Sequence, residues 1–148
     1  MEKTPVLVSA CLLGLACRYD GKQKACREMD GLKGRCALIP ACPEQLGGLP
    51  TPRPPAECRS GRVITDEGND VTTAFQTGAC EALKLARLYS CHYAILKERS
   101  PSCGSGRIYD GTFSGALTYG DGITAALLKS HGIRVFGESE ISDLKRLL

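Results

Sequence analysis

The residues of this chain with the widest range of possible chemistry are its nine cysteines. In a reducing compartment they are not expected to form a disulfide framework, and an odd number would leave one thiol unpaired. The thiols therefore serve as core filling, as nucleophiles or redox groups, or as metal ligands. The position of each cysteine relative to the predicted strands and helices separates these uses.

Three of the cysteines share one kind of position. Cys11 follows the apolar run VLVSA, Cys42 follows ALIPA, and Cys103 follows HYAILK after a short connection. Short apolar runs are typical of buried strands, so each thiol comes after the carboxyl end of a predicted strand. Because ligand sites in open α/β sheets form outside those ends, we expect the three thiols to converge although they are far apart in the sequence.

Coordination chemistry limits what three such thiols would hold. Structural zinc sites usually take cysteines in close pairs such as C-x2-C, and the sequence contains no such pair. Three thiolates from separate loops suit a 4Fe–4S cluster. They would leave one iron open to a soft substrate atom such as sulfur. From the residues alone, cluster binding, a reactive thiol and simple burial in the core all stay open.

A cysteine phosphatase is disfavoured by spacing. Its phosphate loop needs five residues between Cys and Arg, so that backbone amides and the guanidinium surround the phosphate. Here six residues lie between Cys11 and Arg18, and three between Cys103 and Arg107. Neither spacing fits that loop.

The elements that position these residues alternate along the chain. Apolar runs predict strands at residues 6–10, 36–41, 92–97 and 133–136, and a period near 3.6 predicts helices at 71–88, 122–130 and 139–148. This alternation predicts an α/β fold, a Rossmann-like domain with a mostly parallel sheet and helices on both faces. Residues 46–68 show no period, so we expect a functional or mobile connection there.

The chain length and the net charge limit the number of domains and the kinds of partner that we expect. The 148 residues are expected to form a single domain, 1–148, and the net charge of +3 is small and unclustered, which gives no case for nucleic acid or an anionic membrane. No segment reaches the ~20 apolar residues of a membrane span, and the apolar run near the N-terminus is too short for a signal-peptide core. We therefore expect a cytoplasmic protein. The sequence does not indicate its oligomeric state.

Four motifs, read together, resemble a known family. They are SACLLGLACRYDG, ACPEQLGGLPTPR, KERSPSCGSGRIYDGTF and GDGITAALL. They are similar to a bacterial family long known only as a domain of unknown function, whose characterised members are thiouracil desulfidases. The resemblance extends over nearly the whole chain, and the first and third motifs are specific.

The resemblance implies a Rossmann-like domain that carries a 4Fe–4S cluster on Cys11, Cys42 and Cys103. The open iron would take the thiocarbonyl sulfur of a thiolated pyrimidine, as base or nucleotide, and water would replace it at the carbon. The products would be the oxo-base and sulfide, with no net redox change. The resemblance also implies catalytic roles for Glu44 of CPE and Ser100 of SPSCG.

Four further residues are candidates for binding the substrate: Arg18, Asp20, Arg53 and Ser102. Each catalytic or binding candidate also has a structural interpretation. Glu44 would cap a helix that begins near Pro43, Ser100 would be a turn residue, and Arg18 would pair with Asp20 to shape the first loop. A basic residue such as Arg18 would otherwise hold a substrate phosphate.

The other cysteines are mostly expected to be structural. Cys36, Cys80 and Cys91 are predicted to fill the core as small apolar side chains. Cys17 belongs to the CRYDG motif, so it either lines the site as a spare thiol or packs structurally. Two rival functions also stay open: a cluster or thiol protein that senses oxidants or carries sulfur, and a thiol enzyme that uses Cys103 without metal.

Overall fold

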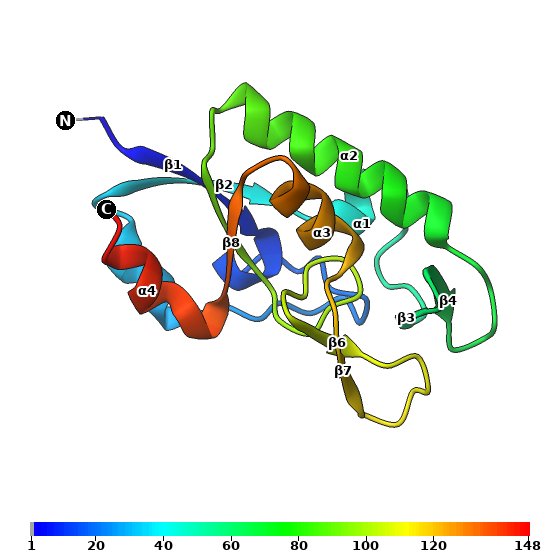
Figure 1. The fold of residues 1–148 in the computed structure, drawn as a ribbon. Helices are drawn as coiled ribbons and strands as arrows, with labels where there is room; N and C mark the ends of the chain where they lie inside the picture. Colours follow the sequence, from blue (N-terminus) through cyan, green and yellow to red (C-terminus); the bar gives the residue numbers. More distant parts are fainter. Residues whose placement is uncertain (1) are drawn as a thin grey trace.

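The computed structural model describes residues 2–148 and is built on a four-stranded sheet (Figure 1). The strand order is β2-β1-β5-β8, and every neighbouring pair is parallel. The four strands correspond to the four predicted apolar runs: β1 (Thr4–Ser9), β2 (Cys36–Ala41), β5 (Tyr93–Leu96) and β8 (Arg134–Gly137). The predicted α/β fold with a parallel sheet is confirmed.

The central strand β1 explains why this sheet has two covered faces. Val6, Leu7 and Val8 are all at most 1% exposed, although consecutive side chains of a strand point to opposite faces. Val6 and Val8 pack in one hydrophobic cluster, and Leu7 packs in the other. A strand buried on both faces is continuously apolar rather than alternating, which is the pattern VLV shows.

Helices cover both faces, as predicted. On the Leu7 face, α2 (Thr72–Leu88) and α3 (Ile123–Ser130) contribute buried residues such as Ala82 and Leu128. On the Val6 face, the 3-10 helix η2 (Arg27–Leu32) and α4 (Ile141–Lys145) contribute Leu32 and Leu144. Figure 1 shows α2 and α3 on one side of the sheet and α4 on the other.

The last helix is shorter than the sequence predicted. Residues 139–148 were expected to be helical, but a 3-10 turn, η3 (Glu138–Glu140), comes first and α4 ends at Lys145. The side chains of this turn bond outside the helix. Glu140 accepts from the Gly137 amide at 2.9 Å, and the Ser139 hydroxyl donates to the Glu98 carboxylate. These contacts fix the turn at the end of β8.

A pair of glycines sets α1 (Pro43–Leu46) directly against α2. A Cβ at Gly78 would lie 1.8 Å from the carbonyl oxygen of Pro43, and one at Gly47 would lie 2.0 Å from that of Ala74. No side chain larger than hydrogen fits at either position. Because α1 follows Cys42, this close packing also fixes where the end of β2 delivers its cysteine.

Two hairpins lie outside the central sheet. They are β3 (Ala56–Arg59) with β4 (Arg62–Thr65), and β6 (Arg107–Tyr109) with β7 (Leu117–Tyr119). The first hairpin lies within residues 46–68, where the sequence predicted only an irregular connection, so that prediction was wrong in part. Its strands have four residues each and are largely half-exposed or exposed, which leaves little alternation to detect.

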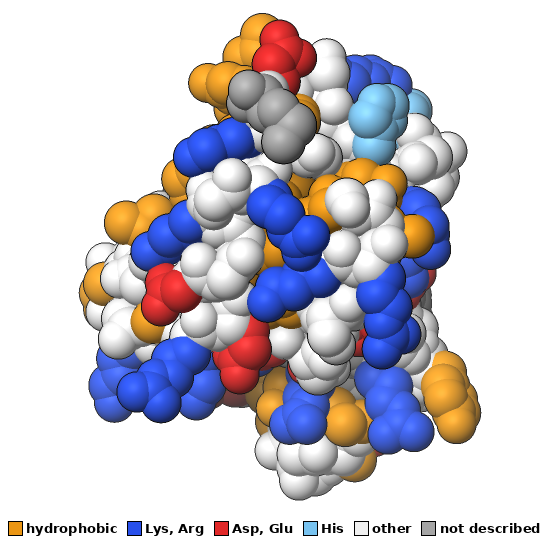
Figure 2. Space-filling model, turned by 90° about the vertical axis from the view of Figure 1, so that its left-hand side faces the viewer, with side chains coloured by type: hydrophobic (Ala, Val, Ile, Leu, Met, Phe, Trp, Pro, Cys, Tyr) orange, Lys and Arg blue, Asp and Glu red, His pale blue; other side chains and the backbone are white. Residues whose placement is uncertain are grey.

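Within residues 2–148, no helix is both long and apolar enough to cross a membrane. Figure 2 shows basic side chains spread over one face of the molecule, with hydrophobic and acidic side chains between them. This distribution fits the small net charge of +3.

Candidate active site

A cavity of about 540 Å³ lies at the carboxyl ends of β1, β2 and β5, and its wall includes Cys11, Cys42 and Cys103. Going outward from β1, the sheet runs to β2 on one side and to β5 and β8 on the other. The crevice between β1 and β5 is therefore the topological switch point, where open α/β sheets bind their ligands. The structure brings the three predicted cysteines to this place.

Each cysteine reaches the cavity from a different local structure. Cys11 lies in the 3-10 helix η1 (Ala10–Leu13), which directly follows β1. Cys42 is the residue between β2 and α1. Cys103 ends a turn after β5, and the Ser102 carbonyl in this turn accepts the Thr124 amide of α3 at 2.8 Å. A Cβ at Gly122 would come within 2.5 Å of Ser102, so glycine is required for this docking.

The three thiols form one electrostatic group. Burial, together with smaller contributions from the neighbouring Glu44, Cys11 and Cys42, raises the pKa of Cys103 to about 12. Burial also raises the pKa of Cys11, although the nearby Lys97 ammonium partly offsets this by lowering it. Thiols that oppose one another's ionisation lie close together, and a bound metal group would relieve that repulsion.

The donor set suits a group larger than one ion. Among residues 2–148, no three Cys, His, Asp or Glu side chains are placed to hold a single metal ion. Cysteine sulfur is the ligand type that multi-metal iron–sulfur groups take, and three such sulfurs, each from its own loop, line this one cavity.

Ser9 is a site residue that the sequence analysis missed. It is 3% exposed at the end of β1, and its hydroxyl oxygen accepts the Lys97 amide from the end of β5 at 2.9 Å. Its side chain also hydrogen-bonds Cys103, which lowers the pKa of that thiol against the larger effect of burial. Ser9 stands two residues before Cys11 in the first motif, which is the one signal that pointed to it.

Glu44 faces the cavity and is held by Arg53. Its Oε1 accepts a hydrogen bond from Arg53 Nε at 3.0 Å, and its side chain is 20% exposed. Arg53 is buried at 8% exposure and donates three more hydrogen bonds, to the carbonyls of Pro50 and Cys17 and to the Thr51 hydroxyl. Four of its five N–H groups therefore have protein partners.

The two serines of the SPSCG motif lie in different environments. Ser100 lines the cavity, and its Oγ accepts the amides of Ser102 and Cys103 at 3.1 and 3.0 Å. The O–H proton of Ser100 is therefore available to donate a hydrogen bond to a ligand. Ser102 is 1% exposed and bonds the Thr124 hydroxyl at 2.8 Å. The structure does not bring Ser102 to the cavity wall, so its geometry supports loop docking rather than substrate contact.

Arg18 and Asp20 also differ in their position relative to the cavity. Arg18 lines the cavity and stacks over the Tyr19 ring at 5.8 Å. Asp20 accepts the Lys22 amide at 3.0 Å, and its carboxylate lies 4.0 Å from the Arg18 guanidinium. The expected ion pair is present at this long distance, and of the two residues Arg18 is the one that reaches the cavity.

Cys17 adds a fourth thiol to the cavity wall. It is 5% exposed, and burial together with the nearby Cys42 and Cys11 raises its pKa to about 12. The Cys42 thiol donates to the Cys17 carbonyl at 3.6 Å. Cys17 therefore lies at the cavity wall and also packs in the hydrophobic cluster on the Val6 face of the sheet, so both uses considered for it stay open.

The remaining cysteines test the core-filling expectation. Cys36 and Cys91 are buried, as predicted, but Cys80 is exposed on α2, so its predicted burial was wrong. The buried stripe of α2 includes Phe75, Ala79 and Ala82. Position 80 is one residue away from that stripe and turns to solvent.

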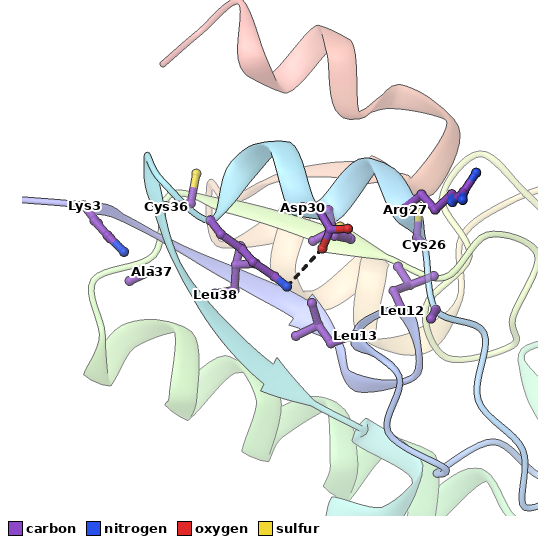
Figure 3. A pocket seen from close by; sticks show the side chains of 12 residues that line it. Lys3, Leu12, Leu13, Cys26, Arg27, Asp30, Cys36, Ala37 and Leu38 are labelled. Carbon is purple, nitrogen blue, oxygen red and sulfur yellow. Dashed lines mark ion pairs between the residues drawn. The ribbon is translucent and has the colours of Figure 1, made fainter.

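A second, more open hollow of about 610 Å³ lies beside β2 and η2 (Figure 3). Leu12, Leu13 and Leu38 contribute apolar walls, and Asp30 forms an ion pair with Lys33 at 3.0 Å at its side. None of the predicted site residues lines it.

The fold and the thiol-lined cavity define a class of protein: an α/β domain with a ligand site at the switch point of a parallel sheet. A family model described as 2-thiouracil desulfurase matches residues 6–140, and the chain belongs to this family. This confirms the resemblance seen in the motifs.

Two similar proteins extend this result. The chain is 45% identical over 149 residues to "Uncharacterized protein YbbK" of Bacillus subtilis (strain 168), covering 94% of this chain and 99% of that protein. It is 49% identical to a solved structure described as "[4Fe-4S]-dependent thiouracil desulfidase TudS (DUF523Vcz)". That match has a TM-score of 0.91 and covers 98% of this chain and 97% of the other.

Proposed function

We propose that this protein hydrolyses the C–S bond of a thiolated pyrimidine, of the thiouracil or thiouridine type, as base or nucleotide, and releases sulfide. The observation that carries the proposal is the meeting of three cysteines from three strand ends in one cavity with Glu44 and Ser100 on its wall. The 2-thiouracil desulfurase family and the similarity to TudS support the same chemistry. A cavity of about 540 Å³ is in the range of small-molecule sites.

Cys11, Cys42 and Cys103 are the residues that would hold a 4Fe–4S cluster. Three buried or half-buried sulfurs that repel one another's negative charge fit such a group. When bound, the cluster would supply an iron without a protein ligand, a Lewis acid suited to a thiocarbonyl sulfur. The Ser9 hydroxyl beside Cys103 would fix the orientation of that ligand.

The net reaction is a hydrolysis. The carbon gains the oxygen of water, its bond to sulfur breaks, and sulfur leaves as hydrosulfide with the electron pair of that bond. The two protons of the water end on the hydrosulfide or in solvent. No electrons are exchanged with an external donor, so the reaction needs no reductant.

We assign Glu44 as the general base that takes a proton from the attacking water. The contact with Arg53 uses Oε1, so Oε2 is the oxygen that takes the proton. Ser100 accepts two amides through Oγ and turns its O–H proton toward the substrate. Arg18 is assigned to binding the substrate at the wall, with Asp20 behind it as its ion-pair partner.

A second candidate function is supported by Cys17. A fourth thiol at the cavity wall suits a protein that carries sulfur or responds to oxidants without turnover of its own. This alternative predicts cluster or thiol chemistry but no catalytic release of sulfide.

Anaerobic reconstitution followed by a turnover assay separates these functions. Cluster-loaded protein is mixed with 2-thiouracil, 4-thiouracil or their nucleotides, and sulfide and oxo-base are measured with and without a reductant. We expect equal amounts of both products, over many turnovers, without a reductant. Stoichiometric sulfur uptake without oxo-base would support the carrier, and activity in metal-free protein would support a thiol enzyme.

A further inference from the structure

Arg53 lines the cavity and joins three separate segments of the chain. Its side chain is 4% exposed, and its partners are Glu44 on α1, the 50–51 segment and the carbonyl of Cys17. Its own amide donates to the Tyr19 carbonyl at 2.8 Å, next to the same loop. One side chain thus links the proposed base to the loop that carries the fourth thiol.

These contacts give the buried Arg53 guanidinium a counter-charge and hydrogen-bond acceptors. A buried cation is costly unless it is paired and its N–H groups have acceptors. Nε binds the carboxylate, one terminal nitrogen binds Pro50 and Thr51, and the other binds Cys17 at 2.9 Å. Substrate binding would have to use the single remaining N–H or break one of these bonds.

The Cys17 contact extends the link to the cysteine that follows β2. The Cys42 thiol lies 3.6 Å from the same Cys17 carbonyl that Arg53 binds. Arg53 therefore links Glu44 to the loop that the Cys42 side chain contacts.

We propose that Arg53 is a positioning residue that fixes the Glu44 carboxylate relative to Cys42. The proposal rests on the proposed function, because it assigns Arg53 an effect on the rate of the same hydrolysis. Arg53 anchors Oε1 and so directs Oε2 into the cavity. The planar guanidinium is required because a lysine ammonium is a single point that does not span three segments in fixed directions.

The main test is Arg53→Lys, measured on anaerobically reconstituted protein with kcat expressed per cluster. We expect kcat to fall about 10²-fold, since a small displacement of a catalytic group has an effect of this size. KM should stay within about twofold, because four of the five Arg53 N–H groups already bond protein acceptors. In a Glu44→Gln background the same substitution should cause no further fall in kcat.

A matched control is Arg62→Lys. Arg62 pairs with Asp70 at the same 3.0 Å distance, but its side chain is 71% exposed on β4. This substitution should leave kcat and KM unchanged. If Arg53→Lys does not fold, Thr51→Val takes its place. It removes one Arg53 contact, together with the hydrogen bond from Gln45 to the same hydroxyl, and should lower kcat less, in the same direction, with no effect on KM.

Iron content and the melting temperature of cluster-free protein are measured on every variant. Lower iron content or stability with an unchanged kcat per cluster would overturn the proposal, because Arg53 would then be merely structural. A raised KM with unchanged kcat would also overturn it and make Arg53 a substrate-binding residue. An inactive wild-type protein would refute the proposed function itself, and this proposal with it.

Discussion

The cavity at the carboxyl ends of the strands and the open hollow beside β2 have similar volumes, about 540 and 610 Å³. Both contain cysteines and charged side chains. The hollow is built mainly from residues close in sequence, on η2, the start of β2 and the segment after β1, and its Asp30 pairs with an exposed Lys33. The cavity draws its groups from the ends of three strands. The convergence of separate reactive groups, rather than volume, distinguishes a site from a surface depression.

The largest expected difference between the two regions is in cluster binding. Cys11→Ser, Cys42→Ser and Cys103→Ser should each greatly lower the iron content from about four per chain, since cysteine sulfur is the preferred ligand. Cys26→Ser, in the hollow, is the matched control and should keep full iron content. Iron and sulfide analysis after anaerobic reconstitution measures this. Equal losses in all four variants would refute the ligand assignment.

Glu44→Gln should separate chemistry from cluster binding. The variant should keep its iron, but its turnover rate should fall by a factor of about 10²–10⁴, which is the usual effect of losing a positioned general base. Asp30→Asn in the hollow is the control and should retain full activity. Thermal melting and single-turnover sulfide release are measured on the same sample. A Glu44→Gln protein that is less stable yet fully active would show that Glu44 only supports its helix.

Ser100→Ala should have a smaller effect that is both structural and catalytic. Its Oγ accepts two backbone amides, so the free energy of unfolding should fall by about 1–2 kcal/mol. Turnover should fall as well if the hydroxyl proton contacts the substrate. Ser114→Ala, on an exposed loop, is the control. Unchanged stability in denaturant titrations would contradict the turn geometry.

The smallest effect is expected from Lys33→Ala in the hollow. The Lys33–Asp30 pair is 66% and 73% exposed, and exposed pairs contribute at most about 0.5 kcal/mol when they are three residues apart. Turnover and iron content should not change. A measurable loss of either would mean that the two regions are coupled, and the comparison between them would fail.

The inner strands β1 and β5 were predictable because most of their residues are buried. Continuous apolar runs such as VLV predict such strands, and the cysteines that follow three of the four runs then fall at the carboxyl edge of the sheet. The β3–β4 and β6–β7 hairpins were missed because their strands have three or four residues, many of them exposed. Short strands held by tertiary contacts give little periodic signal.

Side-chain direction was the part of the site that the sequence did not predict. Ser100 and Ser102 belong to one motif, yet one lines the cavity and the other bonds Thr124. Arg53 lines the cavity, where a substrate-binding residue was expected, but it also makes four hydrogen bonds to protein acceptors that the sequence did not indicate. Ser9 acts through Cys103 and Lys97, two residues far from it in sequence. Each outcome depends on contacts between distant segments, which single-sequence patterns do not contain.

The origin of the three cysteines on three different strands has a consequence for maturation. An unfolded chain presents Cys11, Cys42 and Cys103 as isolated thiols, and they meet only after β1, β2 and β5 have paired. Non-local sites of this kind form late, because distant strands must first close their loops. A cluster held by these three cysteines would therefore be assembled on a chain that is already folded. Cluster-free protein should accordingly show the circular dichroism and cooperative unfolding of a native α/β domain.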